Sequence, residues 1–485
     1  MGELKQQSIQ GIKWSAIERF SIQGISFLIG IILARLLTPE DYGIIGMIGV
    51  FTAIIGSFVD SGFSSALIRK INRTEADCST TFYFNLAMAF VCYAIMFVCS
   101  PYIADFFHTP ILKDIIKVIC LDIVINAFGA VQSARFSWNV DFKSTAKASI
   151  CSTIISGIIG ITMAYTGWGV WALVGQSLSA AIVNVCILWY LSTWHPKLIF
   201  SVASFKELFS FGSKLLASGM LHTLYSQLDT MLIGRYFNST QLGLWSRGKH
   251  IVSYPSTNIT SILQRVTFPI LAKIQNDDIR LISAYRQYIK LASMIIFFLM
   301  MQLFSLGKPL MLFLLTDKWA EAIIFMQIFC FTMMFDHINA ININLLYVKG
   351  RSDLVLKLEV IKKTISISIL IACIPLGLKA LALGMVAYCQ IAIIFNTYYT
   401  GKMFNFGYFK QLKDYMGYFL VSAIACLPSF IMCTLLDWPY LLLLFIGGSI
   451  STVLYTAILY IKKDEMFIKY VIDAISTKIK QLHHK

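Results

Sequence analysis

Long apolar blocks dominate this chain, and each is close to the length that crosses a lipid bilayer. A membrane-spanning helix needs about 20 mainly apolar residues to match the thickness of the hydrocarbon core. Of the 485 residues, 57% are apolar and 13% are charged, whereas soluble domains carry about 25% charged residues. We therefore expect an all-α polytopic membrane protein. The blocks predict about fourteen transmembrane helices, with approximate limits 12–36, 43–63, 80–100, 112–133, 145–166, 170–191, 209–237, 242–269, 288–315, 320–348, 358–376, 379–399, 415–435 and 439–461.

Lysine and arginine gather in the loops that follow the even-numbered helices, such as 69–73 and 349–357. The loops at 38–41 and 437–439, which follow odd-numbered helices, hold no basic residue. The exceptions to this alternation are Arg235, Lys318 and Lys379. The positive-inside rule therefore places both termini in the cytoplasm. It also explains the net charge of +15, so binding of nucleic acid is not expected.

No cofactor or metal site is expected from the residue pattern. The eleven cysteines form no CxxC pair and no cluster with histidine, which is typical of small packing residues. The tail, residues 462–485, alternates basic and apolar residues. This pattern fits a basic amphipathic helix on membrane lipids, and a solvated cytoplasmic tail fits it equally well.

Two segments of the chain resemble each other. Arg35 and Arg235 are 200 positions apart, as are Gly43 and Gly243, and a short polar turn separates each arginine from its glycine. Because both segments start from the cytoplasmic side, the pattern predicts two parallel six-helix repeats. The expected domains are an N-terminal lobe at 1–192, a C-terminal lobe at 193–400, two further helices at 401–461 and the tail. Arg35 and Arg235 are candidates for an outer gate, or for an interface where they reach lipid phosphate.

Polar residues follow helical spacing where hydrocarbon is expected. A charge at the bilayer centre costs at least ~2.5–3.5 kcal/mol, so such residues should face a protein interior or an aqueous cavity. The candidate cavity cations are Arg19, Lys214, Arg247 and Lys249. The candidate polar cavity residues are His222, Ser226, Tyr254, Thr257, Asn258 and Ser261. Together they predict a transporter for a polar or anionic substrate.

Each of these cations also has a structural interpretation. Arg19 could pair with Glu18, and Arg247 could pair with Asp229 across the short turn between their helices. Lys214 lies near an inner helix end, where it could snorkel to the interface. Lys249 could face lipid headgroups.

Three titratable residues are candidates for coupling transport to an ion: Asp229, Asp336 and its neighbour His337. Intramembrane carboxylates and imidazoles recur in proton and cation pathways. For Asp336, a satisfied hydrogen bond between helices is the alternative. The residues leave open whether the ion is H+ or Na+, and whether transport is coupled at all.

Several short motifs resemble one family of membrane proteins. They include the run at 33–43 (LARLLTPEDYG), the segment Gly243–Arg247 (GLWSR) and Asp317–Trp319 (DKW). These motifs are similar to polysaccharide exporters and Wzx-type flippases of the multidrug/oligosaccharidyl-lipid/polysaccharide (MOP) transporter superfamily. The resemblance covers most of the chain up to about residue 360.

This resemblance implies a MATE-like fold of two six-helix lobes around a central cavity, working by alternating access. The implied substrate is a lipid-linked oligosaccharide on undecaprenyl pyrophosphate, moved from the cytoplasmic to the outer leaflet of a bacterial inner membrane. The product would be lipopolysaccharide O-antigen, capsule or exopolysaccharide. Polymerases and glycosyltransferases of the same pathway are the implied partners.

Other functions fit less well. A MATE-type drug/cation antiporter or another lipid flippase would share the fold, but a drug-cation pump should have an acidic cavity. A membrane polysaccharide polymerase or glycosyltransferase would need a sizeable loop or domain for catalysis, and no P-loop is present. A scaffold subunit would gain nothing from intramembrane charges. We therefore expect a transporter and no catalytic residues.

Overall fold

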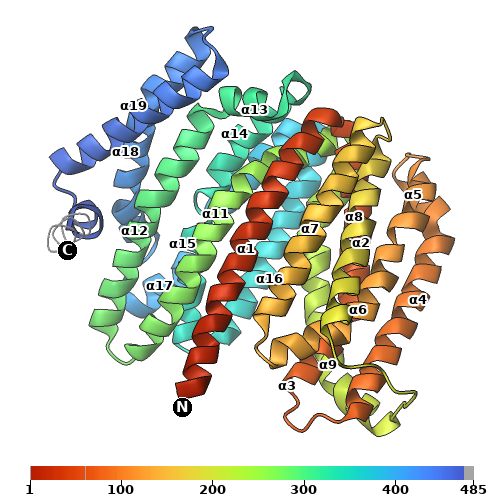
Figure 1. Ribbon diagram of the computed structural model, residues 1–485. Helices are drawn as coiled ribbons and strands as arrows, with labels where there is room; N and C mark the ends of the chain where they lie inside the picture. The colour runs from red at the N-terminus through yellow and green to blue at the C-terminus, as the bar shows by residue number, and fades with distance from the viewer. Residues whose placement is uncertain (1, 61, 474–485) are drawn as a thin grey trace, which may run out of the picture. The chain divides into compact units, whose positions relative to one another are not determined.

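The computed structural model describes residues 2–60 and 62–473, with side chains from residue 13 onward except at 59, 60, 214, 215 and 218. All regular secondary structure in these ranges is helical (Figure 1), which confirms the all-α expectation. The chain divides into two compact units, Met1–Gly243 and Leu244–Lys485. The lobe limits at 192 and 400, inferred from the repeat, stay a prediction. Residues 474–485, which make up half of the predicted basic tail, lie outside the described residues.

The first unit contains ten complete helices in its described part and the start of another. They are α1 (Gly2–Leu36), α2 (Pro39–Asp60), α3 (Phe63–Arg69), α4 (Glu75–Phe106), α5 (Leu112–Ile119), α6 (Leu121–Trp138), α7 (Phe142–Tyr165), α8 (Val170–Leu191), α9 (Val202–Ser226) and α10 (Leu228–Tyr236). Helix α11 (Ser239–Lys273) begins in the first unit and continues into the second.

The second unit continues with α12 (Asp278–Ser305), α13 (Gly307–Leu315), α14 (Ala322–Met333), α15 (Asp336–Val348), α16 (Ser352–Cys373), α17 (Leu378–Phe404), α18 (Tyr408–Leu435), α19 (Tyr440–Ile461) and α20 (Glu465–Phe467). Short 3-10 turns at Asp317–Trp319 and Ile374–Leu376 precede α14 and α17. A π-helical turn at Ile468–Ile472 follows α20.

Ten helical segments in the described part of the chain are long and apolar enough to cross a membrane. Each coincides with one of the fourteen predicted spans. The other four predicted spans, 112–133, 209–237, 242–269 and 358–376, fall on helices that are broken or carry several charged residues. The protein is therefore a multi-pass membrane protein, and the count of fourteen stays a prediction.

Four of the predicted spans are not single helices. The pairs α5–α6, α9–α10, α12–α13 and α14–α15 each occupy one predicted span. In three pairs the second helix carries an aspartate in its first turn: Asp122, Asp229 and Asp336. The free N–H groups at a helix start carry a partial positive charge, which a carboxylate complements. A helix break is thus one way to accommodate a carboxylate inside an apolar span.

The segment that suggested the repeat folds into a capped helix start. Thr38 and Asp41 cap α2 reciprocally, since Thr38 N donates to Asp41 Oδ2 (2.9 Å) and Asp41 N donates to Thr38 Oγ1 (3.3 Å). Pro39 begins the helix, where its missing N–H leaves no partner unsatisfied. Within the same unit, α1 packs on α7 through a cluster that includes Ile29 and Leu33.

Candidate transport site

Helix α11 has one face that packs inside the second unit. A Cβ on Gly248 would come within 2.8 Å of Met326 N, so the two backbones lie in close contact. The Trp245 ring meets Phe329 edge-on, with centroids 4.8 Å apart. Ser256 Oγ donates to the carbonyl of Met333 at 2.9 Å. Helix α11 is therefore seated on α14 by residues three and eight positions apart, which lie on one face of a helix.

The predicted cavity residues of α11 form a polar stripe on the other side of the helix. At about 100° per residue, Arg247, Tyr254 and Ser261 lie about 100–180° around the helix from Gly248 and Val252. His250 and Thr257 belong to the same stripe and are exposed. The hydroxyl of Thr257 donates to Ser253 O (2.6 Å) and that of Ser261 to Asn258 O (2.9 Å). Each hydroxyl thus has its proton satisfied within the helix and keeps oxygen lone pairs for another partner.

The two candidate cations of α11 have different surroundings. The guanidinium of Arg247 lies 5.5 Å from the centre of the Trp319 ring, a cation–π contact. Lys249 lies on the side of α11 nearer α14, and its charge acts on the carboxyl of Asp336 at the start of α15. The structure thus brings together a predicted cavity cation and a predicted coupling carboxylate.

Polar side chains continue along α15 from Asp336 at intervals of three residues. Asn339 Oδ1 accepts a hydrogen bond from Asn396 of α17 at 2.8 Å. Asn342 Oδ1 accepts from Tyr285 Oη (2.7 Å), Thr400 Oγ1 (2.9 Å) and Gln411 Nε2 (3.2 Å).

These groups draw on α12, α15, α17 and α18, and Asn342 is fully buried. The sequence analysis identified Asp336 on this helix but missed Asn342, Asn396 and Gln411. The 336–339–342 spacing on one helical face was the available signal for Asn342.

His337 does not share the surroundings of Asp336, although the two are adjacent in sequence. Its Nε2 lies 2.8 Å from Ser293 Oγ of α12, and its ring is fully buried. The Phe297 ring packs against it with centroids 5.5 Å apart. Asp336 is only half-buried. The two side chains therefore leave α15 toward different neighbours.

In the first unit, the predicted site residues are dispersed over several helices. Asp229 is buried and its Oδ1 accepts from Thr230 N at 2.9 Å. His222 and Ser226 are exposed on α9, and Arg19 and Arg35 are exposed on α1. Lys214 belongs to α9, but its side chain lies outside the described residues.

Arg235 has a well-defined contact within this unit. Its Nη1 donates to the carbonyl of Phe106 at 2.5 Å and also contacts His108 Nε2. The guanidinium lies 5.0 Å from the centre of the Phe106 ring. The arginine thus satisfies a carbonyl at the C-terminal end of α4, where helices lack internal donors.

The described residues contain no group of three or more His, Cys, Asp or Glu side chains that could hold a metal ion. Their polar clusters are instead built from one or two carboxylates with amides, hydroxyls and cations. Such groups suit recognition of a polar or charged solute.

The fold is similar to that of two solved transporters. It matches the lipid II flippase MurJ in an inward closed conformation with a TM-score of 0.74 and 15% identity, covering 93% of this chain and 99% of MurJ. It matches an inward-facing multidrug resistance MATE family transporter of the MOP superfamily with a TM-score of 0.59 and 15% identity, covering 84% and 98%. The chain therefore belongs to the fold class of these two proteins.

Relatives by sequence narrow this class. Teichuronic acid biosynthesis protein TuaB of Bacillus subtilis (strain 168) is 26% identical over 357 residues, 73% of this chain and 74% of TuaB. Lipopolysaccharide biosynthesis protein WzxC of Escherichia coli (strain K12) is 23% identical over 417 residues, 85% and 82% of the two chains. Residues 32–324 match the family described as polysaccharide biosynthesis protein, and the chain belongs to that family. This confirms the resemblance of the motifs, and the chain is a transport protein of polysaccharide biosynthesis, not an enzyme.

Proposed function

We propose that this protein is a flippase that moves a lipid-linked oligosaccharide repeat unit from the cytoplasmic to the outer leaflet by alternating access. Undecaprenyl pyrophosphate is the proposed carrier lipid, and a cell-surface polysaccharide is the product that the exported unit builds. The names of the relatives support this proposal, because both TuaB and WzxC are proteins of polysaccharide biosynthesis. In this proposal both termini lie in the cytoplasm.

The observation that carries the proposal is the polar face of α11. Moving a pyrophosphate and a hydrated glycan through hydrocarbon requires partners that replace water. Arg247 supplies a cation on this face, and the Thr257 and Ser261 hydroxyls keep lone pairs for glycan hydroxyls. Arg19, Lys214 and Lys249 are the further proposed contacts for the pyrophosphate. The lipid tail stays in the bilayer.

Ion coupling is assigned to Asp336 and Lys249 of the second unit, with Asp229 and His337 as further candidates. In this proposal Lys249 supplies a positive charge near the Asp336 carboxyl in the free protein. An anionic substrate that attracts Lys249 would leave the carboxylate without its counter-charge, so that it takes up H+ or Na+. Substrate binding and ion binding would then favour each other, as coupling requires.

The direct test is deletion of the gene followed by analysis of the lipid-linked intermediates. Complete repeat units should accumulate on the cytoplasmic leaflet of the deleted cells. Units that reach the outer leaflet but stay unpolymerised would indicate a polymerase instead. Normal polysaccharide with lost resistance to cationic drugs would indicate a MATE-type antiporter.

A second test addresses the cavity. Complementation with Arg247→Ala combined with Lys214→Ala should fail at normal protein levels. Lys357→Ala, which removes an exposed charge elsewhere, should complement fully. Full transport by the double variant would refute the assignment of these cations.

A further inference from the structure

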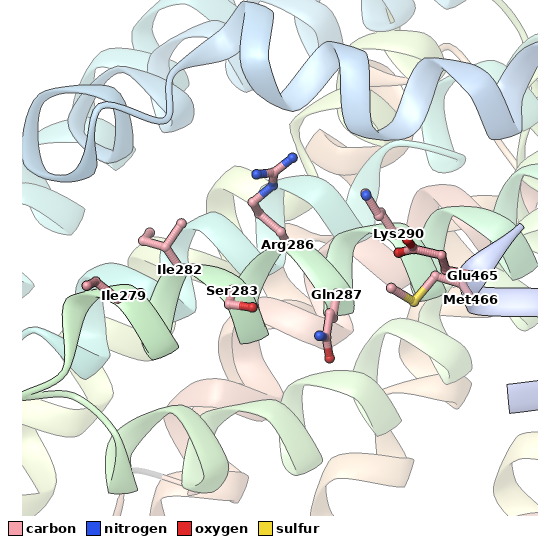
Figure 2. Close-up of a pocket in the computed structure, with 8 residues that line it drawn as sticks. All are labelled: Ile279, Ile282, Ser283, Arg286, Gln287, Lys290, Glu465 and Met466. Atoms are coloured by element: carbon pink, nitrogen blue, oxygen red, sulfur yellow. The ribbon is translucent and has the colours of Figure 1, made fainter. Parts of the chain in front are cut away.

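Two neighbouring cavities lie where α12 meets the last helices of the chain, all within the second unit. Their volumes are about 350 and 400 Å³, and Arg286 and Lys290 line both. Figure 2 shows these two side chains leaving the same side of α12, one helical turn apart, with Glu465 and Met466 at the far end. None of these residues belongs to the polar face of α11 or to the row of Asp336, Asn339 and Asn342 on α15.

The larger cavity has more positive than negative charge. Four basic side chains and two carboxylates line it. Arg286 makes a bidentate pair with Asp414, through Nε–Oδ2 at 2.7 Å and Nη2–Oδ1 at 2.8 Å. The side chain of Asp414 is only 7% exposed. This carboxylate is therefore matched by a guanidinium that holds it in a fixed geometry.

The second carboxylate is also satisfied. Asp464 accepts hydrogen bonds from Tyr418 Oη (2.9 Å) and from Phe467 N (3.0 Å), where it caps α20. Lys290 lies 3.8 Å from Asp414, a carboxylate already paired with Arg286. Lys413 and Lys462 have no carboxylate within 4.0 Å among the described residues. The ammonium groups of Lys413 and Lys462 can therefore bind an anionic ligand from outside the chain.

The other residues that line the larger cavity are mainly apolar, and they lie further from the helix ends than Lys413 and Lys462 do. Gly417, Val421 and Leu459 line the cavity beside the cations. Lys462 directly follows the membrane span that ends at Ile461, and Lys413 lies in the second turn of α18. Basic residues at the end of a span face the headgroup layer, and residues further inside face acyl chains. The cavity therefore matches a ligand with an anionic head and an apolar body.

We propose that this cavity binds the headgroup of an anionic phospholipid of the surrounding leaflet. The phosphate lies between Lys413 and Lys462, with Lys290 behind it, and an acyl chain follows Val421 and Leu459. Lysine suits this role because its ammonium is a point charge that binds a phosphate oxygen from many directions. The site fixes the α18–α19 hairpin to α12, and it is separate from the residues assigned to substrate transport.

Binding to the purified full-length protein tests this site. Native mass spectrometry in a neutral detergent, with phosphatidylglycerol and phosphatidylcholine as probes, should show at least a tenfold preference for phosphatidylglycerol. The variant Lys413→Gln with Lys462→Gln should lose that preference. Both lysines are exposed, so the variant is expected to fold. The control, Lys357→Gln with Lys402→Gln, removes two exposed charges outside the cavity and should keep the preference.

Three results would overturn the proposal. An equal loss in both double variants would show attraction to net charge rather than a site. Competition by free glycerol 3-phosphate at the concentrations at which phosphatidylglycerol binds would assign the cavity to a soluble phosphate. Displacement of phosphatidylglycerol by lower concentrations of undecaprenyl pyrophosphate would assign it to the proposed transported lipid.

Discussion

Gly43 and Gly243 pack against each other's helices in the first unit. A Cβ on Gly43 would lie 1.7 Å from the carbonyl oxygen of Ser239, and one on Gly243 would lie 1.8 Å from that of Pro39. The two glycines are the repeat-related pair 200 positions apart. The relation is reciprocal: the first turn of α2 contacts the first turn of α11, and each uses its glycine at the contact. Absence of a side chain at both positions is what allows this approach.

Replacement of either glycine should disrupt this contact. Gly43→Ala and Gly243→Ala each place a methyl group inside the van der Waals radius of a backbone oxygen, so the two helix starts must separate. We expect a loss of at least ~1–3 kcal/mol in the free energy of unfolding, the usual range for overpacking. Thermal unfolding of the purified protein measures it. Gly49→Ala is the matched control in α2, where nothing lies within 4 Å of an added Cβ. Equal behaviour of Gly43→Ala and Gly49→Ala would contradict the geometry.

Transport should depend on the positive charge of Arg247. We expect Arg247→Ala to reduce export of the repeat unit at least tenfold, because a desolvated anion loses its cationic partner. Arg247→Lys should keep part of the activity, since the charge remains while the planar contact with Trp319 is lost. The measurement is surface polysaccharide per unit of membrane-inserted protein. Equal activity of the alanine and lysine variants would refute a role for the charge.

Lys249 and Asp336 should be energetically coupled. Lys249→Ala alone removes a positive charge near the carboxyl of Asp336, and Asp336→Asn alone removes a negative charge near the ammonium of Lys249. The double variant should therefore be less destabilised than the sum of the single variants, with a coupling energy in the range of about 0.5–3 kcal/mol. Thermal unfolding of the wild type, the two single variants and the double variant gives the four free energies of this double-mutant cycle. Additive effects would show that the two groups do not interact.

Lys70 holds together two elements of the first unit. Its Nζ lies 2.9 Å from Asp77, whose side chain is fully buried, and 2.9 Å from Glu207 of α9. Lys70→Ala leaves the Asp77 charge buried without its cation. Breaking a buried pair costs ~3–5 kcal/mol, and we expect about 2 kcal/mol here because Lys70 is 19% exposed. Lys357→Ala serves as the control, and a similarly small effect of both variants would contradict the prediction.

The same pair has a pH dependence. Burial opposes the charged ammonium, but hydrogen bonds from Lys70 to Glu207 and Asp77 outweigh this and raise the pKa of Lys70 above 10.5. A raised pKa means that the contribution to stability is complete below pH 10.5 and is lost as the pH rises through the folded-state value. The stability difference between Lys70→Ala and the wild type should therefore stay constant between pH 7 and 9.

The periodic features of the chain could be predicted from sequence, because hydropathy and helical spacing are local properties. Apolar blocks located the helices, and three- and four-residue steps placed Arg247, Tyr254 and Ser261 on one face of α11. The breaks before Asp229 and Asp336 could not be found this way. Both flanks of each break favour a helix, and the break depends on which neighbours satisfy the freed backbone groups.

Sequence alone determined that this is a polytopic membrane transporter of its family, since span length, charge alternation and motif order are all linear patterns. Tertiary structure decided which charges meet. Lys249 lies on the side of α11 that packs on α14, away from Tyr254 and Ser261, because the close contact at Gly248 sets the rotation of the helix. Asn342 likewise gains its partners from three other helices. Spacing defines the face of a helix, but only packing defines what that face contacts.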